Sequence, residues 1–119
     1  IDALMNIINV DLIIVDSLSV YYRKYVRENA HDANKKLERQ IRILTELSRR
    51  AMPVLITNQV STHPDSGEIK MLGGEMVKQW GKMIIELKKD ASLRILSVLI
   101  PEEKNIYFEI TNDGIKILS

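Results

Sequence analysis

Asp11-Leu12-Ile13-Ile14-Val15-Asp16-Ser17 and Pro53-Val54-Leu55-Ile56-Thr57-Asn58-Gln59 are the two stretches that decide the fold. Each is a short apolar run that ends in polar residues, and the pattern between them predicts an amphipathic helix. The four apolar residues 12–15 predict a strand buried on both faces, as in a parallel sheet covered by helices. Ligands of such sheets bind at the carboxyl ends of the strands, which is where Asp16, Ser17, Asn58 and Gln59 fall.

An acid that closes an apolar strand is the Walker B pattern, whose carboxylate helps to hold the Mg²⁺ of a bound nucleotide. The alternative for Asp16 is a plain strand-end acid that caps the next turn. No Gly-x-x-x-x-Gly-Lys-Ser/Thr motif occurs in the 119 residues. From the Walker B pattern we expect ATP and Mg²⁺ as cofactors. From the missing motif we expect a P-loop that lies upstream of this segment, and no ATP hydrolysis by these residues alone.

The composition excludes several classes of protein. Hydrophobic residues make up 45% and charged residues 28%, which is typical of a globular chain rather than a disordered one. The absence of cysteine excludes disulfides and Cys-based zinc sites. No apolar run approaches the roughly 20 residues of a membrane span and no signal peptide is present, so we expect a cytoplasmic protein without membrane contact. His31 and His63 lack clustered ligands, and we expect no separate metal site.

The remaining pattern predicts one compact domain over residues 1–119. Apolar residues at helical spacing (Ile1, Leu4, Met5 and Ile8) predict a first helix. A polar segment, 18–34, precedes a helix that is capped by Asn34 and runs to about Ala51. Its predicted buried stripe is Leu37, Ile41, Leu44, Leu47 and Ala51, and its solvated face is Arg39, Arg42, Arg49 and Arg50. A loop over 61–72 and a short helix from Gly73-Gly74 to Trp80 follow. Three or four strands complete the chain, at 82–87, 93–99 and 106–111 with a last piece at 115–118, and a tight turn lies at 112–114.

The order of these motifs resembles the carboxyl-terminal half of the RecA/RadA recombinase core, and most closely the short archaeal RadB family. The matching motifs are Leu12-Ile13-Ile14-Val15-Asp16-Ser17, Leu37-Glu38-Arg39-Gln40, Thr57-Asn58-Gln59-Val60, Gly73-Gly74 with Trp80, Pro101-Glu102, and Phe108-Glu109-Ile110-Thr111 with Gly114-Ile115. The resemblance covers nearly the whole chain. It implies the α/β fold of a RecA-like P-loop NTPase core, with a parallel sheet and an antiparallel extension.

The resemblance also implies roles at the nucleotide. Asp16 matches the Walker B aspartate that acts on Mg²⁺, and Ser17 follows it as in the family. Gln59 matches the catalytic glutamine that senses the γ-phosphate, and Asn58 adjoins it at the same strand end. Pro101 matches the proline of a cap over the adenine of a neighbouring subunit, which implies a homo-oligomer. An alternative for Gln59 is an amide that satisfies buried backbone groups.

Two segments match the DNA-binding loops of the family, residues 22–36 and residues 61–72. In the first, Arg23, Lys24 and Arg27 would hold the phosphates of single-stranded DNA while neighbouring tyrosines stack on bases. The alternative is a solvated helix whose tyrosines pack on the core. In the second, Lys70 is the candidate contact, but this loop is short and not basic. The run 97–100 before Pro101 lacks the charged residues usual in relatives, which weakens ATP sensing between subunits.

Together, these implications predict an ATP-binding DNA repair and homologous recombination protein of the RadB type. It would bind DNA, assist or regulate the main RecA/RadA-type recombinase, and hydrolyse ATP weakly when complete. One alternative is another RecA-fold ATPase, clock-like or helicase-like. The other is a degenerate, non-hydrolysing module that binds the recombinase.

Overall fold

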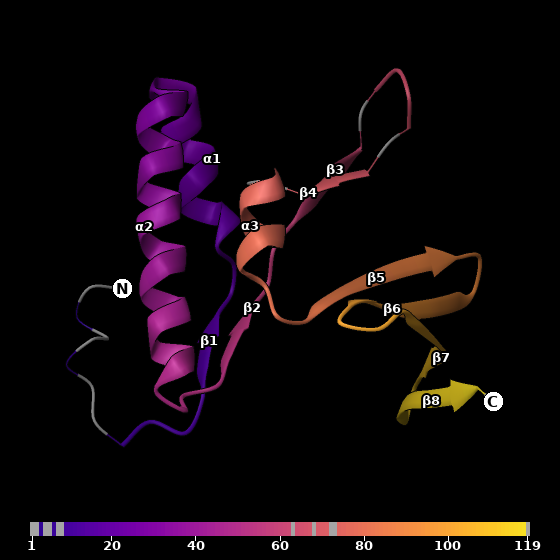
Figure 1. Ribbon diagram of the computed structural model, residues 1–119. Helices are drawn as coiled ribbons and strands as arrows, with labels where there is room; N and C mark the ends of the chain where they lie inside the picture. Colours follow the sequence, from indigo (N-terminus) through magenta and orange to yellow (C-terminus); the bar gives the residue numbers. More distant parts are fainter. Residues whose placement is uncertain are drawn as a thin grey trace. The chain divides into compact units, whose positions relative to one another are not determined.

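The computed structural model describes residues 3, 6, 9–62, 64–67, 69–71 and 74–118, which belong to two compact units, Ile1–Trp80 and Gly81–Ser119. The first unit contains β1 (Ile13–Val15), α1 (Ser19–Glu28), α2 (Ala30–Arg49), β2 (Val54–Ile56), β3 (Val60–Thr62), β4 (Ile69–Met71) and α3 (Gly74–Trp80) (Figure 1). The residues on which the predicted first helix rests, Ile1, Leu4, Met5 and Ile8, lie outside the described ones. Within the described ranges, no helix is long and apolar enough to span a membrane.

The predicted strand-helix-strand unit is present and its two strands are parallel. β1 pairs with β2 so that Ile13 lies opposite Val54 and Val15 lies opposite Ile56. Both strands are shorter than predicted, at three residues each. The parallel pairing brings the carboxyl ends of β1 and β2 to the same edge, which positions the candidate site.

The predicted start of the central helix is wrong. Asn29, rather than Asn34, is the N-cap of α2: its backbone is extended, and its side-chain oxygen accepts a hydrogen bond of 3.2 Å from the Asp32 N–H. The predicted polar segment is itself helical and forms α1. Asn34 lies one turn inside α2, where its side-chain oxygen accepts a hydrogen bond of 2.8 Å from the Tyr22 hydroxyl on α1. Asn34 therefore links the two helices instead of capping α2.

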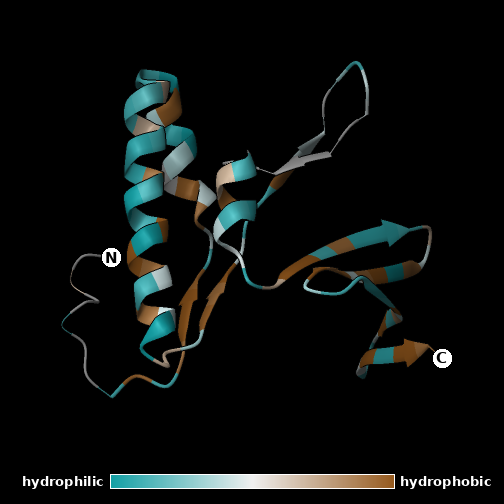
Figure 2. Cartoon of the chain, in the orientation of Figure 1, coloured by the Kyte–Doolittle hydropathy of each residue, from teal (hydrophilic) through white to brown (hydrophobic). Residues whose placement is uncertain are grey.

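The core of the first unit lies under α2. The buried residues of this helix are Ala33, Leu37, Ile41, Leu44 and Leu47. One cluster joins Leu44 and Leu47 to Ile13 of β1. A second joins Leu37 and Ile41 to Leu18, with Trp80 of α3 packed against them. Figure 2 shows hydrophobic residues along β1 and β2 and a mixture of hydrophilic and hydrophobic residues along α2.

The predicted stripe was wrong at its last position. Ala51 is exposed and has a φ of 62°, so the helix has already ended there. Ala33, which the prediction left outside the helix, is 2% exposed. Both errors follow from the predicted bounds of the helix, because α2 begins and ends earlier than predicted.

The predicted burial of β1 on both faces is also wrong for the described residues. Ile13 is buried against α2, but Leu12, Ile14 and Leu55 are 50%, 59% and 51% exposed. Successive side chains of a strand point to opposite faces, so these three share the face away from α2. The described residues supply one helical layer, and it covers one face of this sheet.

The predicted loop at 61–72 contains a β-hairpin. β3 pairs antiparallel with β4, with Val60 opposite Met71 and Thr62 opposite Ile69. Residues 64–66 form a turn and Gly67 follows with a φ of 67°. β-Branched residues in both arms favour the extended pairing over an irregular loop.

The second unit is a four-stranded antiparallel sheet, where the sequence pattern predicted three or four strands and the resemblance implied an antiparallel extension. Its strands β5 (Ile84–Asp90), β6 (Leu93–Ile100), β7 (Lys104–Thr111) and β8 (Gly114–Leu118) pair in chain order. The β7–β8 turn ends at Gly114, whose φ of 124° is a backbone region that suits glycine.

One face of this sheet is strongly apolar. In the pairing register, Leu87 lies opposite Leu96 and Leu96 opposite Ile106, and Ile110 lies opposite Ile115. Paired residues point to the same side, and Ile106 and Ile110 are separated by an even number of positions, so all five share one face. Leu87, Ile110 and Ile115 are 64–71% exposed.

Candidate functional site

The candidate site lies at the edge where β1 and β2 end. Asp16 and Ser17 follow β1 directly, and Thr57, Asn58 and Gln59 follow β2. Because the strands are parallel and in register, these two polar segments lie side by side. Asp16, Thr57 and Gln59 are exposed, whereas Ser17 and Asn58 are half-buried. The edge therefore offers carboxylate, hydroxyl and amide groups that a ligand can reach.

Thr57 links the two segments. Its Oγ1 donates a hydrogen bond of 2.6 Å to Oδ1 of Asp16. Its backbone N–H donates to the Val15 carbonyl at 3.0 Å, and its carbonyl accepts from the Leu18 N–H at 3.1 Å. The contact between the strands thus continues beyond β2 and encloses the Asp16-Ser17 segment, whose peptide bond is cis.

The neighbouring polar side chains are less accessible. The Ser17 and Ser19 hydroxyl oxygens are 3.0 Å apart, and Ser19, the first residue of α1, is 2% exposed. The side-chain oxygen of Asn58 is buried. Gln59 is exposed and immediately precedes β3. Asp16 and Gln59 are therefore the predicted nucleotide residues of this edge that are most open to solvent.

The oxygen donors of this edge fit a magnesium-nucleotide complex. Mg²⁺ is usually held by one or two carboxylates, with substrate phosphates and water as its other ligands. Asp16 supplies one carboxylate. Across the described ranges there is no group of three or more His, Cys, Asp or Glu that could hold a metal by itself. The donor set thus suits Mg²⁺ that arrives with phosphate.

Pro101, the predicted adenine-cap residue, belongs to the second unit. It is exposed in the turn between β6 and β7, after a cis peptide bond with Ile100. It borders an open depression of about 520 Å³ together with Val98, Glu102, Glu103 and Lys104.

The predicted DNA-binding cations of the first segment are exposed on α1. Arg23, Lys24 and Arg27 lie within one helical turn of each other, so they share a side of the helix. Two neighbouring tyrosines contact α2 instead: the Tyr22 hydroxyl donates a hydrogen bond to Asn34, and the Lys36 ammonium is 4.2 Å from the centre of the Tyr25 ring. The alternative of a solvated helix with packed tyrosines therefore describes these two rings. Lys70 lies in β4, where it pairs with Ser61.

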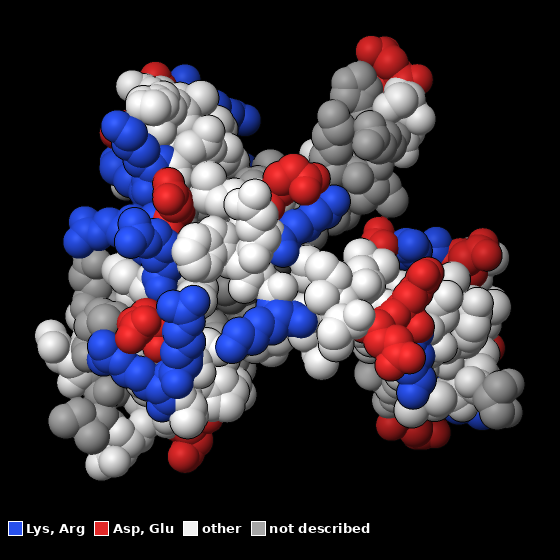
Figure 3. All heavy atoms as spheres, viewed as in Figure 1, with Lys and Arg blue, Asp and Glu red and all other residues white. Residues whose placement is uncertain are grey.

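Positive charge is concentrated in the two long helices. Residues 19–50 contain nine Lys or Arg and four Asp or Glu, a net charge of +5, although the whole chain carries only +1. Figure 3 shows lysine and arginine side chains gathered over α2, with fewer acidic ones between them. The exposed cations of α2 and its C-cap are Lys35, Lys36, Arg39, Arg42, Arg49 and Arg50.

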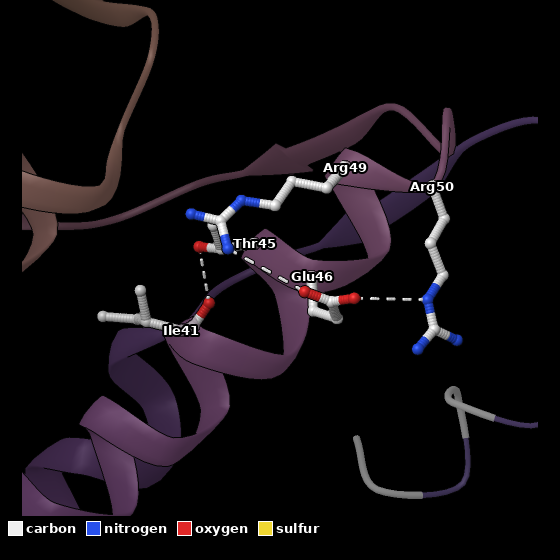
Figure 4. A network of polar contacts seen from close by, with 5 residues as sticks. All are labelled: Ile41, Thr45, Glu46, Arg49 and Arg50. Carbon is white, nitrogen blue, oxygen red and sulfur yellow. Dashed lines mark hydrogen bonds and ion pairs between the residues drawn. The ribbon is translucent and has the colours of Figure 1, made fainter.

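Some of these cations are in ion pairs. Lys36 lies 3.8 Å from Asp32, and Glu46 contacts both Arg49 (3.9 Å) and Arg50 (3.5 Å) (Figure 4). Such exposed pairs each contribute little to stability, typically about 0–1 kcal/mol. The predicted solvated face is confirmed, because its four arginines are exposed: Arg39, Arg42, Arg49 and Arg50.

The sequence pattern alone indicates no role for Thr57. The strand register of the structure shows the relation: Val15 pairs with Ile56, so the next residues along each strand, Asp16 and Thr57, become neighbours. The α2 cations, predicted only as a solvated face, also contribute to the net charge of the helices.

Comparisons with known proteins agree on one family. The Rad51 family model matches residues 2–117. The chain is 32% identical over 119 residues to the "DNA repair and recombination protein RadB" of Methanococcus maripaludis (strain C7), a match that covers 93% of this chain and 54% of the relative. The protein of the same name from Methanococcoides burtonii is 34% identical over 116 residues (91% and 52%), and that from Archaeoglobus fulgidus 30% identical over 114 residues (90% and 52%). The chain thus spans about half the length of these relatives.

Proposed function

Because this chain belongs to the Rad51 family, we propose that it forms part of an ATP-binding DNA repair and recombination protein that binds DNA and assists or regulates a RecA/RadA-type recombinase. The support is the family match over almost the whole chain, together with relatives that bear the name RadB. The family match favours this function over a clock-like or helicase-like ATPase.

The nucleotide part of the proposal rests on one observation: Asp16 is exposed at the carboxyl end of β1, held by Thr57, with Gln59 at the neighbouring strand end. When bound, ATP and Mg²⁺ would supply the phosphoryl group and the positive charge that screens it. Asp16 would hold the cation directly or through water, and Ser17 and Asn58 would line the same edge. Gln59 would meet the γ-phosphate. Catalysis in such sites comes mainly from positioning and electrostatics, which is compatible with weak hydrolysis.

The DNA part of the proposal rests on the exposed cations of α1. Arg23, Lys24 and Arg27 would contact the phosphates of single-stranded DNA, and the net charge of +5 over residues 19–50 would attract the strand. Lys70 of β4 would add one contact from the second segment. Pro101 would act between subunits, over the adenine of a neighbour in a homo-oligomer. The protein would work in the cytoplasm with the DNA on which it acts.

The test is nucleotide binding by the complete protein with Asp16 replaced. Asp16→Asn keeps the size of the side chain and an oxygen that can accept the Thr57 hydrogen bond, but it removes the negative charge. We expect the Mg²⁺-dependent gain in affinity for a fluorescent ATP analogue to fall, while the circular dichroism spectrum stays the same. Asp11→Asn is the matched control, because Asp11 is an exposed acid near the opposite end of β1. Unchanged affinity in the Asp16 variant would remove Asp16 from the site, and an absence of ATP binding by the unaltered protein would favour the non-hydrolysing binding module.

A further inference from the structure

Thr57 has three hydrogen bonds, and together they fix its position relative to Asp16. Its N–H and carbonyl are bonded to Val15 and Leu18, on either side of the Asp16-Ser17 segment. Its side chain is β-branched, so few χ1 rotamers are open to it. The hydroxyl is thus held at a defined place beside the Asp16 carboxylate, to which it donates at 2.6 Å.

The hydrogen bond engages one of the two carboxylate oxygens. Oδ1 of Asp16 accepts from Thr57, while Oδ2 receives no hydrogen bond from this residue. An oriented carboxylate with one oxygen held by a hydroxyl and the other available is suited to bind a cation or a cation-bound water. Partners that orient a metal-binding carboxylate in this way commonly affect metal affinity strongly.

The surroundings argue against a purely structural role. Asp16 and Thr57 are both exposed, so water can satisfy the hydrogen-bonding groups of each side chain without the other. The two backbone hydrogen bonds of Thr57 would hold the strand end with any side chain at this position. The hydroxyl is what distinguishes threonine from valine, which has the same shape and the same preference for strands.

On this geometry we propose that Thr57 is a positioning residue, which orients the Asp16 carboxylate for the Mg²⁺ of a bound nucleotide. The inference rests on the proposed nucleotide function and deepens it. Thr57 touches the carboxylate rather than the cation, so its effect passes through Asp16. It should therefore change the Mg²⁺ requirement of nucleotide binding and not the binding of nucleotide without metal.

The experiment compares Thr57→Val and Thr57→Ser in the complete protein. Valine removes the donor and keeps the branched shape, whereas serine keeps the hydroxyl and loses the methyl group. A fluorescent ATP analogue is titrated at a series of Mg²⁺ concentrations and in EDTA. For Thr57→Val we expect about a tenfold or greater rise in the Mg²⁺ concentration at half-maximal effect, the lower end of what loss of such a partner costs. Affinity in EDTA should be unchanged, and Thr57→Ser should recover most of the wild-type Mg²⁺ dependence. Manganese bound to the protein-nucleotide complex, measured by electron paramagnetic resonance, gives a second readout that does not depend on hydrolysis.

The outcomes separate this inference from the function on which it rests. If the unaltered protein shows no Mg²⁺-dependent nucleotide binding, the proposed function and the inference both fail. If it does, but Thr57→Val has the wild-type Mg²⁺ dependence, only the inference fails. Equal impairment in valine and serine variants, or an equal loss in EDTA, would mean that Thr57 acts on the fold, and thermal denaturation of each variant would show the accompanying loss of stability.

Discussion

Leu44 and Arg42 lie two positions apart on α2, and their side chains have opposite surroundings. Leu44 is 2% exposed and packs in the cluster with Ile13 and Leu47, whereas Arg42 is exposed. Leu44→Ala should lower the free energy of unfolding by roughly 2–5 kcal/mol, because it removes buried methyl groups and leaves a cavity. Arg42→Ala should cost under about 0.5 kcal/mol, as is usual for surface changes.

Urea denaturation followed by circular dichroism measures both values in the same protein. Arg42→Ala is the control for any general effect of substituting alanine in this helix. Equal shifts of the two midpoints would show that the helix is rotated from the orientation described. A rotation of that kind would also remove Leu44 from the neighbourhood of Ile13.

At this scale the sequence was a good guide to the residues that end a strand and a poor guide to what they touch. Asp16 and Gln59 could be placed at one edge because two apolar runs with polar ends predict neighbouring parallel strands. The hydrogen bond from Thr57 could not be predicted, because it depends on the register between segments some 40 residues apart. The packing of Tyr22 and Tyr25 on α2 likewise depends on a contact between helices.

At the scale of elements, the start of α2 shows that the neighbours of a cap residue matter. Asn29 and Asn34 are both residues that cap helices well. Asp32 lies in the first turn after Asn29, where an acid suits the positive end of the helix dipole, whereas two lysines follow Asn34. The hairpin of β3 and β4 was not predicted, because its strands are three residues long and too short to show an alternating pattern.

The exposed cations of α1 lead to a prediction about DNA. Replacing Arg23, Lys24 and Arg27 together by alanine should weaken binding of single-stranded DNA by the complete protein. The slope of log affinity against log salt should become shallower by about 0.7 for each phosphate that the protein no longer neutralises. The measurement is fluorescence anisotropy of a labelled oligonucleotide at several salt concentrations, with and without ATP.

A control variant should remove the same charge elsewhere. Lys82, Lys89 and Lys104 are three exposed lysines of the second unit, and their joint replacement by alanine should leave the salt slope close to that of the unaltered protein. If the α1 variant keeps both its affinity and its slope, α1 is a solvated or partner-binding surface, and a role as a binding module becomes the better explanation.

At the scale of the whole molecule, the fold class was predictable and the burial of its sheets was not. The sequence predicted a parallel and an antiparallel sheet, and both are present. The apolar run at 12–15 predicted helices on both faces of the parallel sheet, yet Leu12 and Ile14 are at least half exposed. A hydrophobic pattern shows which side chains favour burial, but it does not show which segment covers them. The same holds for Leu87, Ile110 and Ile115 in the second unit.

The pairing order of the strands affects the order in which the two sheets form during folding. The partners in the β5–β8 sheet are consecutive along the chain, whereas Ile13 and Val54 are brought together across 41 positions. Long-range pairing must first meet the entropy cost of closing a long loop, so local hairpins form sooner. In pulsed hydrogen exchange during refolding, amides of β6 and β7 should be protected before those of β1 and β2, and the reverse order would contradict this. The edge that is proposed to hold the nucleotide would then be among the last parts of a refolding chain to form.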